Sequence, residues 1–202
     1  NALGYSIFEA LMERNIVFEG WRDKQLFEAA VRKFGQKDAK LKDRALRIGR
    51  FHARWCGDVT RITPMLDLVN RRYVIASDTD RAARTFQSGY EGQGKWIRYD
   101  ELCGRDESLT AEDFVEDAAL QAAADELQAT RPALPKCVGG FPEAAGKLRY
   151  LQDWLQKQWG LSGRDLKEAE NELKGLIFDE IKPSSVSDSY RSVLVGLIDA
   201  LE

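Results

Sequence analysis

The chain has little cysteine, almost no histidine and no long apolar run. Its three cysteines, Cys56, Cys103 and Cys137, are widely spaced and odd in number, so they form no disulfide framework and favour a reducing compartment. The single histidine, His52, cannot complete a positioned Ser-His-Asp or Cys-His nucleophile set. No stretch approaches the roughly 18 apolar residues of a membrane span, and no signal-peptide pattern precedes Gly4. We therefore expect a cytoplasmic protein without membrane association.

The charges that are present divide unevenly between the two halves of the chain. Up to Arg98 there are 19 Lys and Arg against 12 Asp and Glu, a net of +7. From Tyr99 onward the count is 11 against 21, a net of −10, and the two halves sum to −3. Such an asymmetry suggests a polyanion partner for the basic half, or a partner that contacts both halves.

Helical patterns dominate the chain. Ser6 and Glu9 form a capping box that starts one helix, which fades at Asn15. A second helix is expected from about residue 22 to 34, ending at Gly35, and Asp38 caps a third that extends to about Cys56. The remaining expected helices start at Thr63-Pro64, Thr110, Pro142, Ser162 and Ser187.

Two short β-favouring runs interrupt this pattern, at residues 73–76 and 96–99. A polar helical turn and a glycine-rich loop separate them. The sequence therefore predicts a mainly α protein, a multi-helix bundle of one or two helical lobes, with a small two-stranded β excursion around residues 72–99. Prolines and a glycine pair mark residues 131–141 as a linker. It divides a basic helical lobe, 3–130, from a three-helix segment, 142–202, that packs on the first lobe.

One predicted helix carries an unusual stripe of positive charge. If residues 40–55 form one helix, five cations fall within an arc of about 120°, and Leu41, Ile48 and Trp55 lie on the adjacent apolar side. The preceding helix end and turn add three more cations. Together the predicted nucleic-acid-binding residues are Lys40, Arg44, Arg47, Arg50, Arg54, Arg32, Lys33 and Lys37.

Arginine-rich surfaces suit a phosphate backbone, because guanidinium groups make bidentate phosphate contacts and release counterions. A solvated face, or one paired with the acidic half of the same chain, is the competing interpretation. The helix from Thr110, which carries Glu112, Asp113, Glu116 and Asp117, could supply such pairing.

Other patterns are weaker. The segment Gly89–Lys95 has the GxxxxGK spacing of a phosphate-binding loop, but Trp96 stands where Ser or Thr would ligate magnesium. His52 and Cys56 have a spacing compatible with zinc, without a second ligand pair nearby in sequence. Carboxylate pairs such as Glu168 and Glu172 lie in charge-rich helices and are best interpreted as solvated faces.

The sequence thus predicts no catalytic residues, no cofactor and no metal site. The function it favours is that of a non-enzymatic accessory or regulatory protein that binds nucleic acid through the cationic helix. An adaptor for an acidic protein partner is the first alternative, and an enzyme that uses the Gly89–Lys95 loop is the second. The apolar C-terminal helices could also form a homo-oligomer contact.

Overall fold

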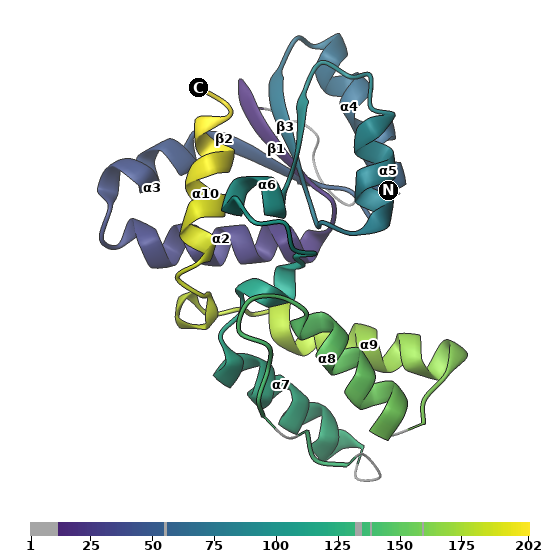
Figure 1. Cartoon of the computed structure of the whole chain (residues 1–202). Coiled ribbons are helices and arrows are strands. Elements are labelled where there is room, and N and C mark those ends of the chain that lie inside the picture. Colours follow the sequence, from purple (N-terminus) through teal and green to yellow (C-terminus); the bar gives the residue numbers. More distant parts are fainter. Residues whose placement is uncertain (1–11, 55, 132–134, 138, 159) are drawn as a thin grey trace.

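The computed structural model describes residues 12–54, 56–131, 135–137, 139–158 and 160–202. Its centre is a parallel four-stranded sheet with the strand order β2-β1-β3-β4 (Figure 1). Strand β1 is a central strand, so its residue Ile16 lies beside Arg50 of β2 on one side and beside Val74 of β3 on the other. The strands are β1 (Arg14–Phe18), β2 (Ile48–His52), β3 (Arg72–Ser77) and β4 (Lys95–Arg98).

Alternating side chains of the strands bury two separate faces of this sheet, as the two-residue period of a strand requires. Ile16 and Phe18 of β1 belong to one hydrophobic cluster, whereas Val17 belongs to the other. In β3, Val74 faces the first cluster and Ile75 the second. Both faces are therefore covered by helices, which is typical of a parallel sheet.

The first face is covered by α2 (Trp21–Gly35), α3 (Ala39–Leu46) and α10 (Tyr190–Asp199). Helix α2 buries Leu26, Phe27 and Ala30, which recur at helical spacing. Asp38 caps α3, because its Oδ1 accepts a hydrogen bond of 3.0 Å from the Leu41 amide. The short helix α6 (Tyr99–Cys103) lies between the end of β4 and α10 (Figure 1).

The second face is covered by α4 (Cys56–Leu68) and α5 (Arg81–Ser88). Each connects two parallel strands, α4 from β2 to β3 and α5 from β3 to β4. Helix α4 buries Cys56, Val59 and Leu66 against the sheet. Pro64 lies inside α4, so the residues Thr63-Pro64, predicted as a helix start, continue a helix that begins seven residues before Thr63.

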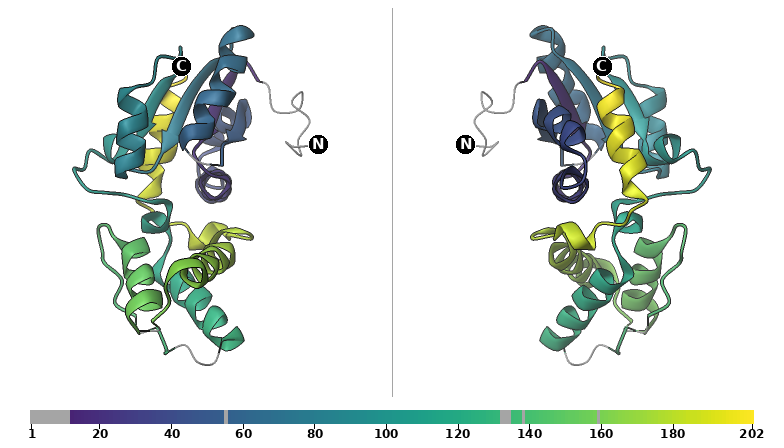
Figure 2. Two further views of the ribbon diagram at one scale, coloured as in Figure 1. Left: turned by 90° about the vertical axis from the view of Figure 1, so that its right-hand side faces the viewer. Right: turned by 90° about the vertical axis from the view of Figure 1, so that its left-hand side faces the viewer.

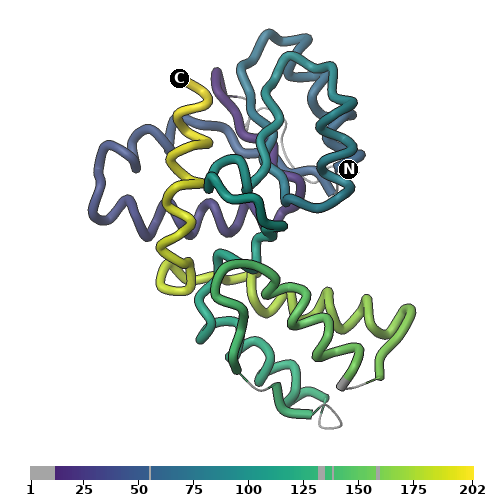
Figure 3. Tube along the Cα trace, viewed as in Figure 1, coloured from purple at the N-terminus to yellow at the C-terminus, as the bar shows by residue number. Residues whose placement is uncertain are grey.

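A second group of helices lies below the sheet in Figure 1, and the turned views of Figure 2 agree. It contains the 3₁₀ turn η1 (Ala111–Phe114), α7 (Asp117–Thr130), α8 (Lys147–Asp153), η2 (Trp154–Gln158) and α9 (Gly163–Phe178). A further turn, η3 (Pro183–Ser185), leads back to α10, which Figure 3 traces beside α2. The buried residues of this group continue into the core of the first face.

The expected mainly α bundle is therefore wrong, since the fold is an α/β arrangement around a parallel sheet. The supposed excursion at 72–99 contains half of that sheet, β3 and β4, which pair with each other in parallel. The first two residues of β1 fall at the end of the helix expected from Ser6, and the rest of β1 was predicted as no element. Strand β2 falls inside the expected cationic helix. Short buried strands have too few residues for their period to be distinguished from a helix by pattern alone.

The cationic helix itself is also divided. It ends at Leu46, and Arg47 leads into β2, so the five cations of the predicted stripe lie on a helix, a strand and a loop. Leu41 and Ile48 are buried as expected, while Trp55 lies outside the described residues. The helix predicted from Ser6 lies outside them up to residue 11, and its expected end at Asn15 belongs to β1. In the described part of the chain, no helix is long and apolar enough to cross a bilayer.

Candidate functional site

The carboxyl ends of β1 and β3 meet at the centre of the sheet, and acidic residues follow both. Glu19 comes directly after β1, Asp78 comes directly after β3, and Asp80 follows two residues later. The chain then continues into α2 on one face and into α5 on the other. A crevice outside the strand ends is expected where two neighbouring connections leave in opposite directions, and open parallel sheets bind their ligands there.

Glu19 is held at this edge by the backbone, because its amide donates a hydrogen bond of 3.0 Å to the carbonyl oxygen of Ala76 in β3. Burial, together with the charges of Asp23 and Asp80, raises the pKa of Glu19 to about 7, although hydrogen bonds from the Cys56 thiol and the Asp78 backbone lower it. Its Oε2 is buried and has no hydrogen-bond partner among the described residues. Half of this carboxylate is thus desolvated without compensation.

Asp23 lies in the first turn of α2, and the loop from β1 brings it back toward Glu19. Its Oδ1 accepts a hydrogen bond of 2.6 Å from the Tyr99 hydroxyl, and its Oδ2 accepts one of 3.1 Å from the Gly20 amide. Gly20 allows this close turn, since a Cβ there would lie 2.9 Å from Asp23 Oδ2. Burial raises the pKa of Asp23 to about 6, while the Tyr99 hydrogen bond opposes that rise.

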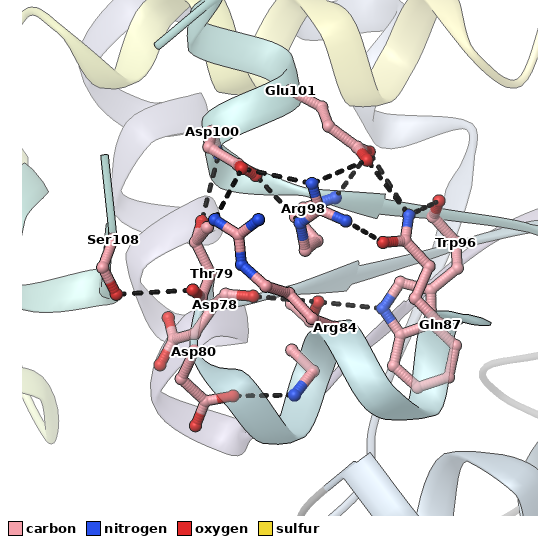
Figure 4. A network of polar contacts seen from close by, with 12 residues as sticks. Asp78, Thr79, Asp80, Arg84, Gln87, Trp96, Arg98, Asp100, Glu101 and Ser108 are labelled. Carbon is pink, nitrogen blue, oxygen red and sulfur yellow. Dashed lines mark hydrogen bonds and ion pairs between the residues drawn. The ribbon is translucent and has the colours of Figure 1, made fainter. Parts of the chain in front are cut away.

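Asp78 and Asp80 flank Thr79 in the turn between β3 and α5. Burial raises the pKa of Asp78 well above its ordinary value, and the charges of Asp23, Glu112 and Glu19 add to this effect. Oδ1 of Asp78 is buried and, within the described part of the chain, has no hydrogen-bond partner. Asp80 is exposed and caps α5, because its Oδ1 accepts a hydrogen bond of 2.7 Å from the Ala83 amide (Figure 4).

The second group of helices contributes one more carboxylate and one cation. Glu112 of η1 is 3% exposed, and its Oε1 lies 3.7 Å from Nζ of Lys174 on α9. Burial lowers the pKa of Lys174, but Glu112, Glu170 and Asp78 outweigh that effect and the pKa lies above its ordinary value. Lys174 is therefore a charged lysine beside a group of carboxylates.

The site is thus an excess of negative charge with little compensation. Its acidic residues, which we call the acidic cluster, are Glu19, Asp23, Asp78, Asp80 and Glu112. Burial and the charges of their acidic neighbours raise the pKa of Glu19, Asp23 and Asp78. No three His, Cys, Asp or Glu side chains in the described ranges, however, stand as a ready-made ligand set. Such a cluster favours an added cation, because like charges that are partly buried repel strongly.

Three arginines lie in the segments that follow β2 and β3 at this edge of the sheet. Arg81 is the first residue of α5 and Arg84 follows one turn later, while Arg54 lies two residues after β2. Arg54 and Arg81 are exposed and make no ion pair with any described residue. An acidic centre with exposed arginines at its rim can hold a cation and an anionic substrate at once.

The predicted nucleic-acid-binding residues do not form one surface. Arg54 lies at the carboxyl edge of the sheet, whereas Arg47 precedes β2 at the amino edge. The strand between them is itself about 13 Å long, at a rise of about 3.3 Å per residue. Arg50 on β2 is half-buried, donates to the Ala45 carbonyl oxygen at 2.9 Å and pairs with Glu28 at 3.8 Å. Arg47 pairs with Asp43 at 3.0 Å, and Lys40 is exposed on α3.

Several of these cations pair with the acidic half of the chain, as the competing interpretation held. Arg44 contacts Asp199 at 2.5 Å and Glu202 at 2.7 Å. Lys33 contacts Asp188 at 2.6 Å, and Arg32 donates to the Ile181 carbonyl oxygen at 3.3 Å. Lys33 and Lys37 line a cleft of about 430 Å³ with four other residues, Phe34, Asp38, Asp188 and Arg191. The partners come from the C-terminal segment instead of the helix from Thr110.

The remaining motifs from the sequence are the Gly89–Lys95 loop and the pair His52 and Cys56. The Gly89–Lys95 loop leads into the amino end of β4, which is the opposite edge of the sheet from the cluster. A Cβ at Gly94 would lie 2.0 Å from the ring of Tyr73, so this glycine allows close packing. Cys56 lies next to Glu19, where burial raises the thiol pKa and suppresses its reactivity. His52 ends β2, and burial lowers its pKa.

Sequence reasoning missed every member of this cluster except Glu112, which it assigned to a solvated helix. A local signal exists in both strands: an apolar run ends in an acidic residue, at Ile16–Glu19 and again at Val74–Asp78. Without the parallel pairing of β1 with β3, nothing in the sequence brings these two ends together.

Comparison with known proteins adds little. No family model matches the chain, and no curated protein matches it. It is similar to a solved structure described as the C-terminal region of the Burkholderia pseudomallei OLD protein, with a TM-score of 0.47 and 13% sequence identity. That alignment covers 95% of this chain and 100% of the other. A likeness at this level carries no argument, so we infer function from the site itself.

Proposed function

We propose that this protein hydrolyses phosphodiester bonds in nucleic acid with a divalent cation, Mg²⁺ or Mn²⁺, held by Glu19, Asp78 and Asp80. The observation that carries this proposal is a pair of buried carboxylate oxygens, Glu19 Oε2 and Asp78 Oδ1, that lack a partner among the described residues. They end two neighbouring parallel strands, where open α/β sheets bind ligands.

A hydrated divalent cation fits this donor set. Mg²⁺ prefers carboxylate oxygens, keeps several of its waters, and needs only one or two carboxylates together with a substrate phosphate. The acidic cluster therefore does not have to form a closed ligand shell beforehand. When bound, the cation would polarise a phosphate and lower the pKa of a water molecule. It would also relieve the repulsion that raises the pKa values of Glu19 and Asp78.

The remaining residues of the cluster have roles that follow from their contacts. Tyr99 fixes Asp23 by its 2.6 Å hydrogen bond, and Asp23 in turn holds the Gly20 turn that positions Glu19. Lys174, charged and 3.7 Å from Glu112, would limit the net negative charge that a phosphate meets. These groups orient the ligand set and adjust its charge.

Nucleic acid is the substrate that the surrounding charge favours. Arg54 and Arg81 are exposed at the same edge and can contact phosphates on either side of the cleaved bond. The net charge of +7 up to Arg98 would attract a polyanion.

Cleavage of nucleic acid by the purified protein tests the proposal. Supercoiled plasmid, single-stranded DNA and RNA would be incubated with Mg²⁺, Mn²⁺ or EDTA. We expect cleavage of at least one substrate with a divalent cation, and loss of at least about 100-fold in rate for Glu19→Gln and Asp78→Asn. Glu168→Gln is the matched control, because Glu168 is exposed and pairs with Arg164 on its own helix. Equal rates in all four proteins would refute the assignment.

Binding of the cation can be measured without substrate. Millimolar Mg²⁺ or Mn²⁺ should raise the melting temperature of the wild-type protein and of Glu168→Gln, since a ligand of the folded state stabilises it. The same addition should leave the melting temperature of Asp78→Asn unchanged. If the wild-type protein shows neither stabilisation nor cleavage, the metal site is wrong.

A second candidate function is binding of nucleic acid without cleavage, through the cations predicted from the sequence. It is favoured by Lys37 and Lys40, which are exposed and form no ion pair among the described residues. Gel-shift titrations at two salt concentrations test it, because each phosphate contact adds about 0.9 to the steepness of the salt dependence on duplex DNA. Binding with no cleavage in any cation would favour this candidate. An acidic protein as partner would leave nucleic acid unbound at both salt concentrations.

A further inference from the structure

Beside the acidic cluster lies a network of two arginines and two carboxylates that no step of the proposed function uses. Figure 4 shows its members around the turn from Asp78 to Asp80: Arg84 and Gln87 from α5, and Arg98, Asp100 and Glu101 from the end of β4 and the start of α6. The Arg84 side chain runs from α5 past Thr79 toward Asp100 (Figure 4).

The two arginines of this network differ in how completely they are held. Arg98 contacts Asp100 through two nitrogens, at 3.1 and 3.2 Å, and Glu101 at 3.1 Å, and it also donates to Gln87. Its side chain is 16% exposed. The guanidinium of Arg98 is therefore half-buried and held in place by several hydrogen bonds, and it has a structural role.

Arg84 has one contact in the network, at 3.5 Å from Asp100 Oδ2, and its side chain is 46% exposed. The carboxylate that it meets is 6% exposed and already bonded to Arg98 on both oxygens. That bonding lowers the pKa of Asp100 in spite of its burial, so its charge is permanent near neutral pH. Asp100 thus orients the Arg84 side chain, and the Arg84 guanidinium keeps N–H donors that do not bond to Asp100.

The position of Arg84 follows from the same turn that places two residues of the cluster. Its backbone amide donates to the Asp80 carbonyl oxygen at 3.2 Å, so the two residues share one face of α5. The Asp100 amide donates to Thr79 Oγ1 at 3.2 Å, which joins the network to the residue between Asp78 and Asp80. Arg84 is therefore a half-exposed guanidinium within one helical turn of the proposed metal ligands.

We infer that Arg84 binds a non-bridging oxygen of the substrate phosphate next to the cation, and that Asp100 is the residue that positions it. This inference rests on the proposed function for its substrate. A guanidinium presents two parallel donors that match a phosphate, and this one is oriented before the substrate arrives. It would act from α5, whereas Lys174 belongs to α9 and contacts Glu112.

The test compares Arg84→Gln, Arg84→Lys and Asp100→Asn with Arg71→Gln as matched control. Arg71 is exposed and precedes β3 at the opposite edge of the sheet, so its variant loses the same charge away from the site. Affinity for a duplex oligonucleotide would be measured by fluorescence anisotropy at several salt concentrations, with Ca²⁺ in place of Mg²⁺ to separate binding from turnover. Cleavage rates in Mg²⁺ and metal-induced stabilisation would be measured on the same proteins.

We expect Arg84→Gln to bind about 10- to 100-fold more weakly and to show a salt slope shallower by about 0.9. Arg84→Lys should recover the slope but only part of the affinity, because an ammonium keeps the charge and loses the bidentate geometry. Asp100→Asn should keep the slope and reduce the cleavage rate. All three should retain stabilisation by Mg²⁺ or Mn²⁺, since none is a proposed metal ligand.

The outcomes separate this inference from the proposed function. Arg84 does not contact the phosphate if Arg84→Gln keeps the wild-type salt slope and the wild-type cleavage rate. The same conclusion holds if Arg84→Gln loses no more affinity for the oligonucleotide than Arg71→Gln does. If the wild-type protein binds nucleic acid but never cleaves it, the proposed function is wrong. The salt slope of Arg84→Gln then shows by itself whether Arg84 contacts a phosphate. A wild-type protein that binds no nucleic acid refutes both. Circular dichroism of each variant excludes loss of folding as the cause.

Discussion

Glu19 offers a direct measure of how strongly the acidic cluster opposes folding when no cation is bound. Its pKa rises from 4.5 to about 7 in the folded protein, because the carboxylate is buried among Asp23 and Asp80. Replacing it by Gln removes this charge while keeping the size of the side chain. We therefore predict that Glu19→Gln is more stable than the wild-type protein at pH 8 in EDTA, although it should be inactive.

The magnitude follows from proton linkage. A folded-state pKa above the unfolded value means that the folded protein binds the proton more tightly, so stability is lost as the pH rises from about 4.5 through about 7. The cost of ionising Glu19 is then about 3 kcal/mol at pH 8 and less than about 1 kcal/mol at pH 5. The difference between the two pH values, about 2.5 kcal/mol, is independent of any other effect of the substitution.

Urea unfolding at pH 5 and pH 8, each in EDTA, measures this difference for wild type, Glu19→Gln and the control Glu168→Gln. At pH 8 the gain of Glu19→Gln should appear as a melting temperature higher by about 6–12 °C for a chain of this size. Saturating Mg²⁺ should reduce or reverse the gain, because only the wild-type carboxylate contributes to the cation site. A change in stability that is the same at pH 5 and pH 8 would show that Glu19 is not a strained carboxylate.

Three further predictions concern the supports of the site and the surface around it. Tyr99→Phe removes the hydroxyl that donates to the buried Asp23 and should cost about 1–3 kcal/mol in urea unfolding at pH 8; an unchanged midpoint would contradict the contact. Ile75→Ala in β3, where Ile75 is fully buried, should cost about 2–5 kcal/mol, and a smaller loss would question the parallel sheet. Lys40→Glu combined with Arg47→Glu should weaken binding to all nucleic-acid sequences alike in gel shifts without lowering the melting temperature, and unchanged affinity would remove these two residues from the predicted interface.

Much of the local structure could be predicted from the sequence because its causes are local. The helix that ends at Gly35 and the cap at Asp38 depend on residues within one turn of each other, and both are present. The β-favouring runs at residues 73–76 and 96–99 lie within β3 and at β4, since β-branched and aromatic side chains suit a pleated surface. The charge difference between the halves is also fixed by the sequence, and part of it forms ion pairs between Arg44 and the C-terminal residues.

The tertiary structure alone decided the sheet and the candidate site. Strands β1 and β2 have five residues each, too short for a period to reveal them, and they are stable because each finds a parallel partner far away in the chain. Glu19 and Asp78 are 59 positions apart, and the acidic residue that ends each apolar run does not by itself indicate that the two lie together. Their carboxylates acquire raised pKa values only where the parallel pairing of β1 and β3 brings both strand ends to one edge and the helices above exclude water.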